Sequence, residues 1–329
     1  MTTLVTGATG FVGSAVVRQL LERGDVVRVL ARPGGDRRNI AGLPVEVVEG
    51  DLRDPAASRR ALAGISDLFH VAADYRLWVR DSSVMYATNV EATVSLMRSA
   101  ADAGVSRIVF TSSVATLGVW PDHTPADEMT PASLDEMVGP YKRSKYLAEE
   151  AVRELAESDG LPIVIVNPAA PVGPRDVRPT PTGRIIIEAA RGRTPAFVDT
   201  GLSVVHVDDV ARGHLLAHER GQAGQRYILG GENLTLQDML TTVTRLAGRR
   251  APWIKLPAAA VLPVGYVSEA LAAVLPGWEP FITVTGVRLA KKRMFFSSAK
   301  ARRDLGYVPR GAQEAFGDAL AWFRANGYL

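Results

Sequence analysis

The chain has 329 residues, of which 47% are hydrophobic and 22% charged, and it contains no cysteine. These proportions are typical of a compact globular protein and disfavour disordered, collagen-like and coiled-coil classes. The lack of cysteine excludes disulfides, thiolate nucleophiles and sulfur-ligated metal centres, and a net charge of +3 with dispersed basic residues does not favour nucleic-acid binding.

Short apolar runs alternate with helix-like segments through the first half of the chain. This alternation predicts an α/β fold in which a doubly wound parallel sheet of the Rossmann type is covered by helices on both faces. Strands are expected at residues 4–6, 26–31, 45–49, 68–71, 107–111 and 163–167.

The pattern changes at Pro168, where prolines and arginines crowd into a loop-like segment. Strand-like segments at 203–207 and 226–229 follow and are expected to rejoin the main sheet, and the pattern after Gly230 is mostly helical. We therefore predict a dinucleotide-binding domain formed by residues 1–170 and about 203–229. Residues from about 171–202 and 230–329 are expected to form a smaller, mainly helical substrate lobe.

The N-terminal residues lack a basic segment followed by a long apolar one, so we expect no cleaved signal peptide and a cytoplasmic location. Residues 256–275 are apolar but contain Pro257, Pro263, Gly265 and Glu269, which argues against a membrane-spanning helix. A buried helix pair is expected there, and a hydrophobic substrate pocket or a peripheral contact with a membrane surface are the alternatives.

A glycine-rich turn lies between the first strand and the first amphipathic helix. Its glycines, Gly7, Gly10 and Gly13, let the backbone turn tightly and approach a diphosphate, whose charge the helix N-terminus favours. This context predicts a dinucleotide site, with a structural turn or another phosphate ligand as alternatives. The whole motif is Gly7-Ala8-Thr9-Gly10-Phe11-Val12-Gly13.

The second strand ends at Arg32, where an NAD site would normally carry an acid for the ribose hydroxyls. A guanidinium there suits a 2′-phosphate, so we expect NADP(H) to be preferred, with NAD(H) possible and with Arg37 and Arg38 as auxiliaries. A solvated basic loop is the alternative. In Gly50-Asp51-Leu52, Asp51 is expected either to bind the adenine amine or to cap a helix.

Tyr141 and Lys145 are four residues apart and therefore lie on one face of a helix. A neighbouring lysine favours the phenolate, which makes Tyr141 a candidate general acid or base. Upstream, a buried-looking strand ends in Thr111-Ser112-Ser113, whose hydroxyls can hold a carbonyl or an alcohol, or simply end the strand in a turn.

His214 and His218 are also four residues apart, but no third ligand is evident. We expect them on a surface helix face, and we expect no metal site.

The motifs together resemble the extended short-chain dehydrogenase/reductase superfamily of NAD-dependent epimerases and dehydratases, and the resemblance covers nearly the whole chain. Within it, the segments 71–78, 178–184 and 230–235 look like the group labelled hopanoid-associated sugar epimerase, which is similar to dihydroflavonol 4-reductases. The motifs, in the order of the superfamily, are the glycine turn, Gly50-Asp51-Leu52, His70-Val71-Ala72-Ala73, Asn89, Thr111-Ser112-Ser113, Tyr141 to Lys145, Asn167-Pro168 and His206 to Ala211.

This resemblance implies a role for each matching residue. Ser113 would be the catalytic hydroxyl, Tyr141 the proton donor or acceptor, and Lys145 the group that holds the nicotinamide ribose and lowers the tyrosine pKa. Asn89 would position a relay water. Ala72, Ala73, Thr111 and Pro168 would border the cofactor.

Three functions remain open from the sequence. The first is an NADP(H)-dependent reductase or dehydrogenase acting on a small-molecule ketone or secondary alcohol that is sugar- or lipid-linked, which the resemblance connects to hopanoid biosynthesis. The second is a sugar-linked epimerase or dehydratase that recycles its cofactor, in which Arg178 and Arg184 would meet a phosphate. The third is a cofactor-binding protein without chemistry. Family members often form homodimers, so the resemblance also allows a homodimer.

Overall fold

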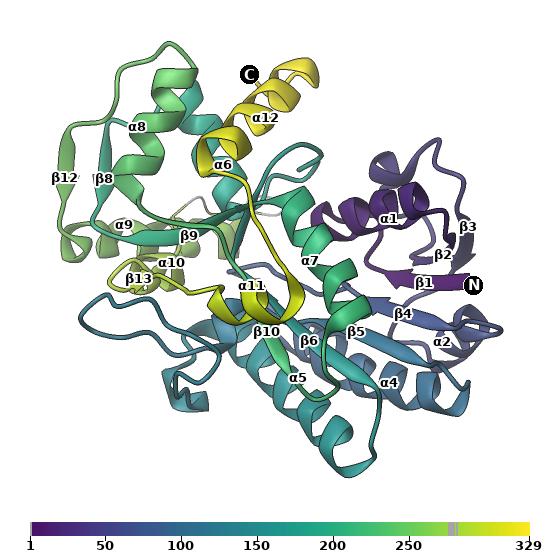
Figure 1. Ribbon diagram of the computed structural model, residues 1–329. Helices are drawn as coiled ribbons and strands as arrows, with labels where there is room; N and C mark the ends of the chain where they lie inside the picture. The colour runs from purple at the N-terminus through teal and green to yellow at the C-terminus, as the bar shows by residue number, and fades with distance from the viewer. Residues whose placement is uncertain (1, 276–279, 281) are drawn as a thin grey trace.

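The structure is a computed structural model that describes residues 2–275, 280 and 282–329 (Figure 1). Its main sheet has seven parallel strands in the order β10-β6-β5-β4-β1-β2-β3. The order reverses between β1 and β4, which places a ligand-binding switch point at the carboxyl ends of these two strands. The strands are β1 (Thr2–Thr6), β2 (Val26–Ala31), β3 (Glu46–Glu49), β4 (Asp67–His70), β5 (Arg107–Thr111), β6 (Ile163–Pro168) and β10 (Arg226–Leu229).

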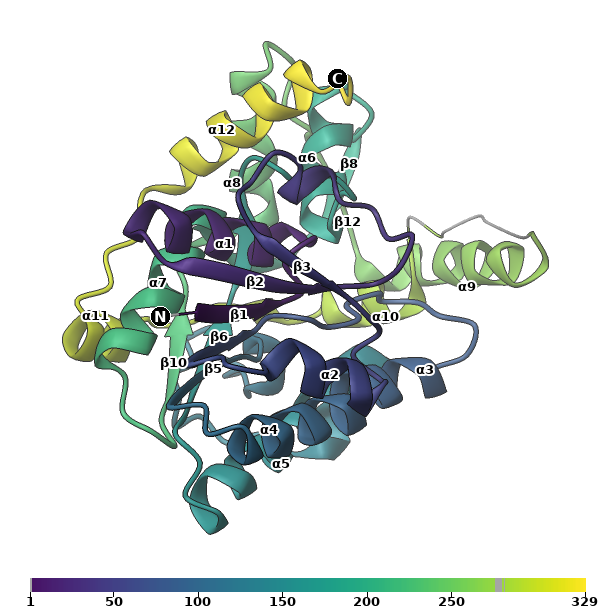
Figure 2. The ribbon, with the colours of Figure 1, turned by 90° about the vertical axis from the view of Figure 1, so that its right-hand side faces the viewer.

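Helices cover both faces of this sheet (Figure 2). Neighbouring strand residues point to opposite faces, so the fully buried Leu4 and Val5 of β1 belong to two separate hydrophobic cores. This arrangement confirms the predicted doubly wound α/β fold. On one face lie α1 (Phe11–Arg23), α7 (Val207–Arg220) and α11 (Ala299–Leu305), and on the other α2 (Pro55–Leu62), α4 (Ala92–Asp102) and α5 (Gly139–Ser158).

A second sheet is formed by strands that all follow β6 in the chain. Its central strand, β9 (Gly201–His206), pairs with β7 (Ala170–Val172), β11 (Glu232–Thr235) and β13 (Arg293–Met294). The expectation that residues 203–207 rejoin the main sheet is therefore wrong, because β10 occupies the edge beside β6 and β7 pairs with β9 instead.

The remaining helices build a third core against the second sheet. They are α6 (Pro181–Ala190), α8 (Leu236–Leu246) and α12 (Ala312–Ala325), and beside them β8 (Ala196–Val198) pairs with β12 (Ile254–Leu256). Short helical turns connect other elements: η1 (Arg38–Ile40), α3 (Ser83–Tyr86), η2 (Ala87–Glu91), η3 (Val114–Thr116) and η4 (Leu134–Glu136).

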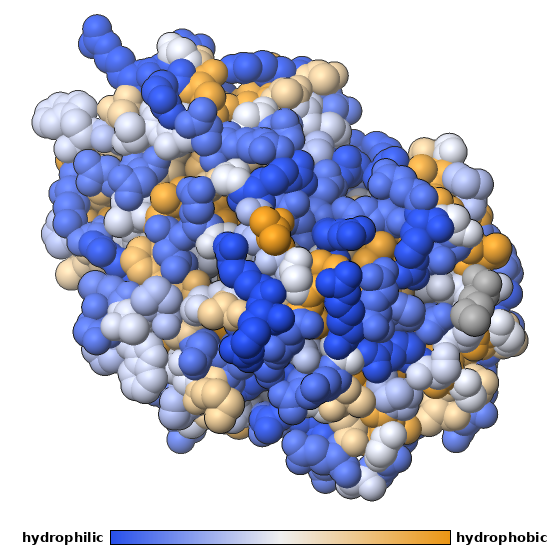
Figure 3. Space-filling view, viewed as in Figure 1, coloured by the Kyte–Doolittle hydropathy of each residue, from blue (hydrophilic) through white to orange (hydrophobic). Residues whose placement is uncertain are grey.

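The apolar segment at 256–275 forms α9 (Ala258–Val274), which packs against α10 (Val284–Leu289). The expected buried helix pair is wrong, because only Gly265 and Ala272 of α9 are buried. Figure 2 shows α9 extending away from the rest of the chain. The face of the molecule that is seen in Figure 3 is largely hydrophilic. None of the described helices has the length and apolar composition needed to cross a membrane.

Candidate active site

The glycine turn is shaped by contacts that leave no room for side chains. Gly7 has a φ of 72°, and a Cβ on it would lie 2.6 Å from the backbone nitrogen of Ala72. A Cβ on Gly13 would lie 2.2 Å from the Gly7 carbonyl oxygen. The turn therefore brings the end of β1, the start of α1 and the segment after β4 into direct contact.

The first turn of α1 is suited to an anion. Gly10 precedes the helix in an extended conformation, and the first turn, which begins with Phe11 and Val12, contains no acidic residue. Its first amide groups have no acceptor within the helix and are available to a diphosphate. The side-chain amide of Asn39 donates a hydrogen bond to the Thr9 carbonyl at 3.2 Å and so supports the turn. The residues present thus fit a dinucleotide.

The three arginines expected at the adenosine end differ in their surroundings. Arg32 is exposed, and no hydrogen bond or ion pair holds its guanidinium among the described residues. Arg37 is paired with Glu49, and Arg38 with Asp36 at 2.7 Å. Arg32 is therefore the one whose charge is most open to a ligand.

Asp51 lies at the carboxyl end of β3, close to this arginine. It accepts hydrogen bonds from the backbone and guanidinium of Arg53, which hold its pKa at about 2, below the ordinary value. The expectation that Asp51 caps a helix is wrong, because α2 is capped by Asp54, which accepts from the Ala56 amide at 2.9 Å. Leu52 is buried in the core beneath it.

Tyr141 and Ser113 face one another across the ends of α5 and β5. Tyr141 lies in the first turn of α5, and Ser113 follows β5. Burial raises the pKa of Tyr141, and a side-chain hydrogen bond with Ser113 partly opposes this rise. The protonated phenol of Tyr141 and the hydroxyl of Ser113 thus lie next to one another.

Lys145 is one helical turn beyond Tyr141 and is buried. Its Nζ donates to the Thr111 carbonyl at 2.8 Å and lies 4.9 Å from the centre of the Phe110 ring. Burial lowers its pKa to about 8, although the Glu149 carboxylate acts in the opposite direction. The ammonium is thereby fixed between β5 and α5.

Asn89 connects α5 to the segment after β4. It lies in the π-helical turn η2, a geometry often found at functional sites. Its Oδ1 accepts from the Asp74 amide at 2.7 Å, and its Nδ2 donates to the Asp74 carbonyl at 2.9 Å and to Ser144 Oγ at 3.0 Å. The side chain of Asn89 thus ties the Asp74 backbone to α5.

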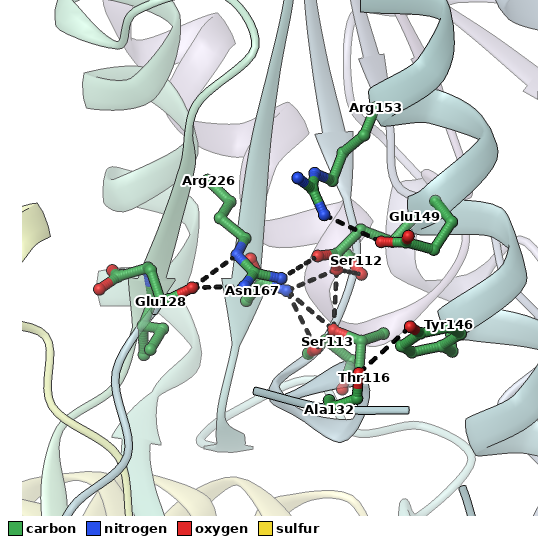
Figure 4. Close-up of polar contacts among 12 residues, drawn as sticks. Ser112, Ser113, Thr116, Glu128, Ala132, Tyr146, Glu149, Arg153, Asn167 and Arg226 are labelled. Carbon is green, nitrogen blue, oxygen red and sulfur yellow. Dashed lines mark hydrogen bonds and ion pairs between the residues drawn. The ribbon is translucent and has the colours of Figure 1, made fainter. Parts of the chain in front are cut away.

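A buried polar cluster, which the sequence motifs do not indicate, is centred on Glu149 (Figure 4). Glu149 Oε2 accepts hydrogen bonds from Ser112, from Thr116 at 2.8 Å and from Asn167 Nδ2 at 2.8 Å. Its Oε1 forms an ion pair of 2.9 Å with Arg226. A signal was present, because Glu149 follows Lys145 by four residues on the same helix face.

This cluster reaches Ser113 through its backbone. Asn167 Nδ2 donates to the Ser113 carbonyl at 3.1 Å, and Asn167 directly precedes Pro168 at the end of β6. Arg226 also donates to the backbone carbonyl of Glu128. The side-chain carboxylate of Glu128 in turn accepts a hydrogen bond from the Ile228 amide at 2.8 Å. The position of Ser113 therefore depends on contacts among β5, β6, β10 and α5.

Two buried histidines flank the site without forming a metal centre. His70 lies between Thr6 Oγ1 at 2.7 Å and Thr93 Oγ1 at 2.9 Å, and burial lowers its pKa to about 3. His214 contacts Thr111 Oγ1 at 2.9 Å, so the expected surface position of His214 is wrong. Among the described residues no group of three or more histidine, aspartate or glutamate side chains is arranged to hold a metal ion.

The chain is similar to known proteins over its whole length. The model of the NAD dependent epimerase/dehydratase family matches residues 3–230. The crystal structure of gox2253 is 54% identical, with a TM-score of 0.89, and covers 100% of this chain and 99% of its own.

Two curated relatives also span nearly the full length. Sterol demethylase protein B of Methylococcus capsulatus is 38% identical over 100% of both chains. A 4-hydroxy-2-methyl-3-oxo-4-farnesyl-3,4-dihydroquinoline-1-oxide ketoreductase of Stigmatella aurantiaca is 30% identical over 97% of this chain and 96% of the relative.

Proposed function

Because this chain belongs to the NAD-dependent epimerase/dehydratase family, within the extended short-chain dehydrogenase/reductase superfamily, we propose that it is an NADP(H)-dependent oxidoreductase of ketones or secondary alcohols. The contact between Ser113 and Tyr141, with Lys145 one turn away, carries this proposal. A bound nicotinamide would supply or accept the hydride.

We infer a role for each of these side chains. Ser113 steadies the substrate oxygen, and Tyr141 gives it a proton in reduction or removes one in oxidation. Lys145 holds positive charge beside the phenol and the nicotinamide ribose, which favours the phenolate once Tyr141 has lost its proton. Asn89 positions α5 and a relay water.

The cofactor would be held at the switch point of the main sheet. The amides at the start of α1, with Gly7, Gly10 and Gly13, hold the diphosphate. Ala72, Ala73, Thr111 and Pro168 border the nicotinamide half. Arg32 binds the 2′-phosphate of NADP(H), because its exposed guanidinium matches a dianion.

The main sheet and its helices form the dinucleotide-binding part in this proposal, and the elements around the second sheet form the substrate part. The names of the two relatives refer to a sterol and a farnesyl group, which favours a ketone or alcohol on a lipid-like skeleton. A link to hopanoid biosynthesis and a cytoplasmic location belong to the same proposal.

The test compares Tyr141→Phe with a matched control on the same helix. Tyr146 donates a hydrogen bond to the Ala132 carbonyl at 3.3 Å, outside the proposed site, so Tyr146→Phe should leave turnover within about two-fold. Tyr141→Phe should lower kcat by about 100-fold or more, with the Kd for NADPH changed less than about three-fold. Equal activity of the two variants would contradict the assignment.

A second experiment tests the cofactor. Fluorescence titration should show that Arg32→Ser weakens NADPH binding by about ten-fold or more and leaves NADH binding nearly unchanged. Arg60→Ser, on the outside of α2, is the control. Tightly retained NAD in the purified protein, with no net change of cofactor absorbance during turnover, would favour the epimerase or dehydratase instead.

A further inference from the structure

The helix α9 presents an unusual surface of large apolar side chains. Val267 is 62% exposed, Leu271 46% and Val274 76%, and Val264 and Tyr266 are also about half exposed. Contiguous exposed apolar surface of this kind marks an interaction site, because a monomeric protein normally buries it.

Within α9, all of which the structure describes, no acidic side chain interrupts this surface. The single acidic residue of α9 is Glu269, which turns inward and accepts a hydrogen bond from the Val284 amide at the start of α10, at 2.8 Å. This contact anchors α9 to α10 and leaves the outer face of the helix without negative charge.

Cations lie around the apolar face instead. Arg288 of α10 reaches the Tyr266 hydroxyl at 3.3 Å, and Arg80 donates to the Ala273 carbonyl at the C-terminal end of α9, at 3.0 Å. Lys291, shortly after α10, is exposed as well. An apolar helix face with arginines in contact with it is complementary to a bilayer that contains anionic lipids.

The same helix pair lies close to the proposed active site. Thr285 of α10 lies 2.8 Å from the position of a Cβ on Gly139, which is two residues before Tyr141. A surface to which α9 binds would therefore be near the end of α5 that carries the phenol.

We propose that α9 is a membrane-docking element that lies flat on an anionic bilayer, with Val267, Leu271 and Val274 among the acyl chains and Arg80, Arg288 and Lys291 at the headgroups. At 17 residues, with Pro263 inside it, α9 is suited to lie in the interface and not to cross it. This binding does not depend on the reaction proposed above.

A second copy of the chain fits this face less well. Most dimers are two-fold symmetric and bring the same patch of both copies together. The cations around α9 would then meet their own counterparts, and like charges in contact disfavour association. A bilayer with anionic headgroups satisfies both the apolar face and its positive border.

The test is co-sedimentation of the full chain with vesicles of phosphatidylcholine alone or with about one-third phosphatidylglycerol. The chain should bind the anionic vesicles, and binding should fall with added salt. The double variant Val267→Asp/Leu271→Asp should reduce vesicle partitioning by about ten-fold or more. Val308→Asp, at a 77% exposed valine outside α9, should bind like the parent.

Two results would overturn the proposal. One is the absence of parent binding to either kind of vesicle. The other is a concentration-dependent dimer in sedimentation analysis that the double variant abolishes, since α9 would then be an interface between copies. Circular dichroism and NADPH titration establish that the variants are folded, and because neither readout uses turnover, failure here leaves the proposed reaction untouched.

Discussion

Replacing Glu149 by glutamine tests the buried cluster behind the proposed active site. The carboxylate accepts from three uncharged donors on one oxygen and from Arg226 on the other. A glutamine has the same shape but only one accepting oxygen, so its NH₂ group must face either Arg226 or the three donors. Glu149→Gln therefore loses at least one charge-assisted hydrogen bond and places donors against each other.

The magnitude follows from the surroundings of Arg226. A hydrogen bond to a charged group contributes about 1.5–3 kcal/mol, and an unpaired buried charge costs more. Because the Arg226 side chain is 22% exposed and keeps its bonds to the Glu128 carbonyl, part of that cost is recovered by water and backbone. We expect Glu149→Gln to lower the free energy of unfolding by about 2–3 kcal/mol.

Urea unfolding at neutral pH, followed by circular dichroism, measures this loss. The control is Glu150→Gln, since Glu150 is 47% exposed and pairs with Arg153 on the surface at 3.0 Å. An exposed pair of this kind contributes little, so the control should change stability by less than about 0.5 kcal/mol. If the two variants lose the same stability, the cluster is not a stabilising unit and the reasoning is refuted.

The same variant should also affect turnover. Asn167 donates both to Glu149 and to the Ser113 carbonyl, so loosening the carboxylate loosens Ser113. A lower kcat with an unchanged Kd for NADPH is expected, because the glycine turn lies outside the cluster.

Two further predictions concern the glycine turn and a buried acid. Gly13→Ala should abolish dinucleotide binding and cost more than about 2 kcal/mol of stability, because its Cβ would clash with the Gly7 carbonyl oxygen, whereas Gly317→Ala, with open space around it, should be neutral or stabilising. Burial raises the pKa of Asp176 to about 6, so the folded parent binds more protons than the unfolded chain between about pH 4 and 6, and its stability falls as the pH rises through this range. Asp176→Asn cannot lose this proton, so its free energy of unfolding relative to that of the parent should increase by up to about 3 kcal/mol from pH 4 to 7. Thermal unfolding at several pH values measures this difference, and a difference that does not change with pH would contradict the raised pKa.

The main sheet could be predicted because its strands are short apolar runs bounded by turns, and because motif residues such as Gly7 and Ser113 lie within two residues of a strand end. Parallel strands bring their carboxyl ends to one edge, so the proximity of these motifs follows from their order alone. The position of β9 could not be predicted in this way. Val204 and Val205 are both fully buried, and such a strand fits either sheet by its sequence.

The ion pairs between side chains also could not be predicted from the sequence. The sequence does not distinguish the three arginines of this basic loop, Arg32, Arg37 and Arg38. The register of β3 places Glu49 beside Arg37 and leaves the Arg32 guanidinium accessible to a ligand. The exposure of α9 is a similar case. Apolar composition measures the tendency to leave water, and only the fold decides whether a partner surface is present within the chain.

The protonation of the site favours one direction of the proposed reaction. Reduction of a ketone needs a proton donor, whereas oxidation of an alcohol needs a phenolate. Burial raises the pKa of Tyr141 and lowers that of Lys145 to about 8, so both groups are protonated at neutral pH before a ligand binds. The resting site thus holds a phenol and an ammonium ready to donate, and kcat for ketone reduction should fall as the pH rises through the range in which these groups lose their protons. A rate of reduction that stays constant as the pH rises through about 8, where Lys145 loses its proton, would show that the Lys145 ammonium does not assist the proton transfer.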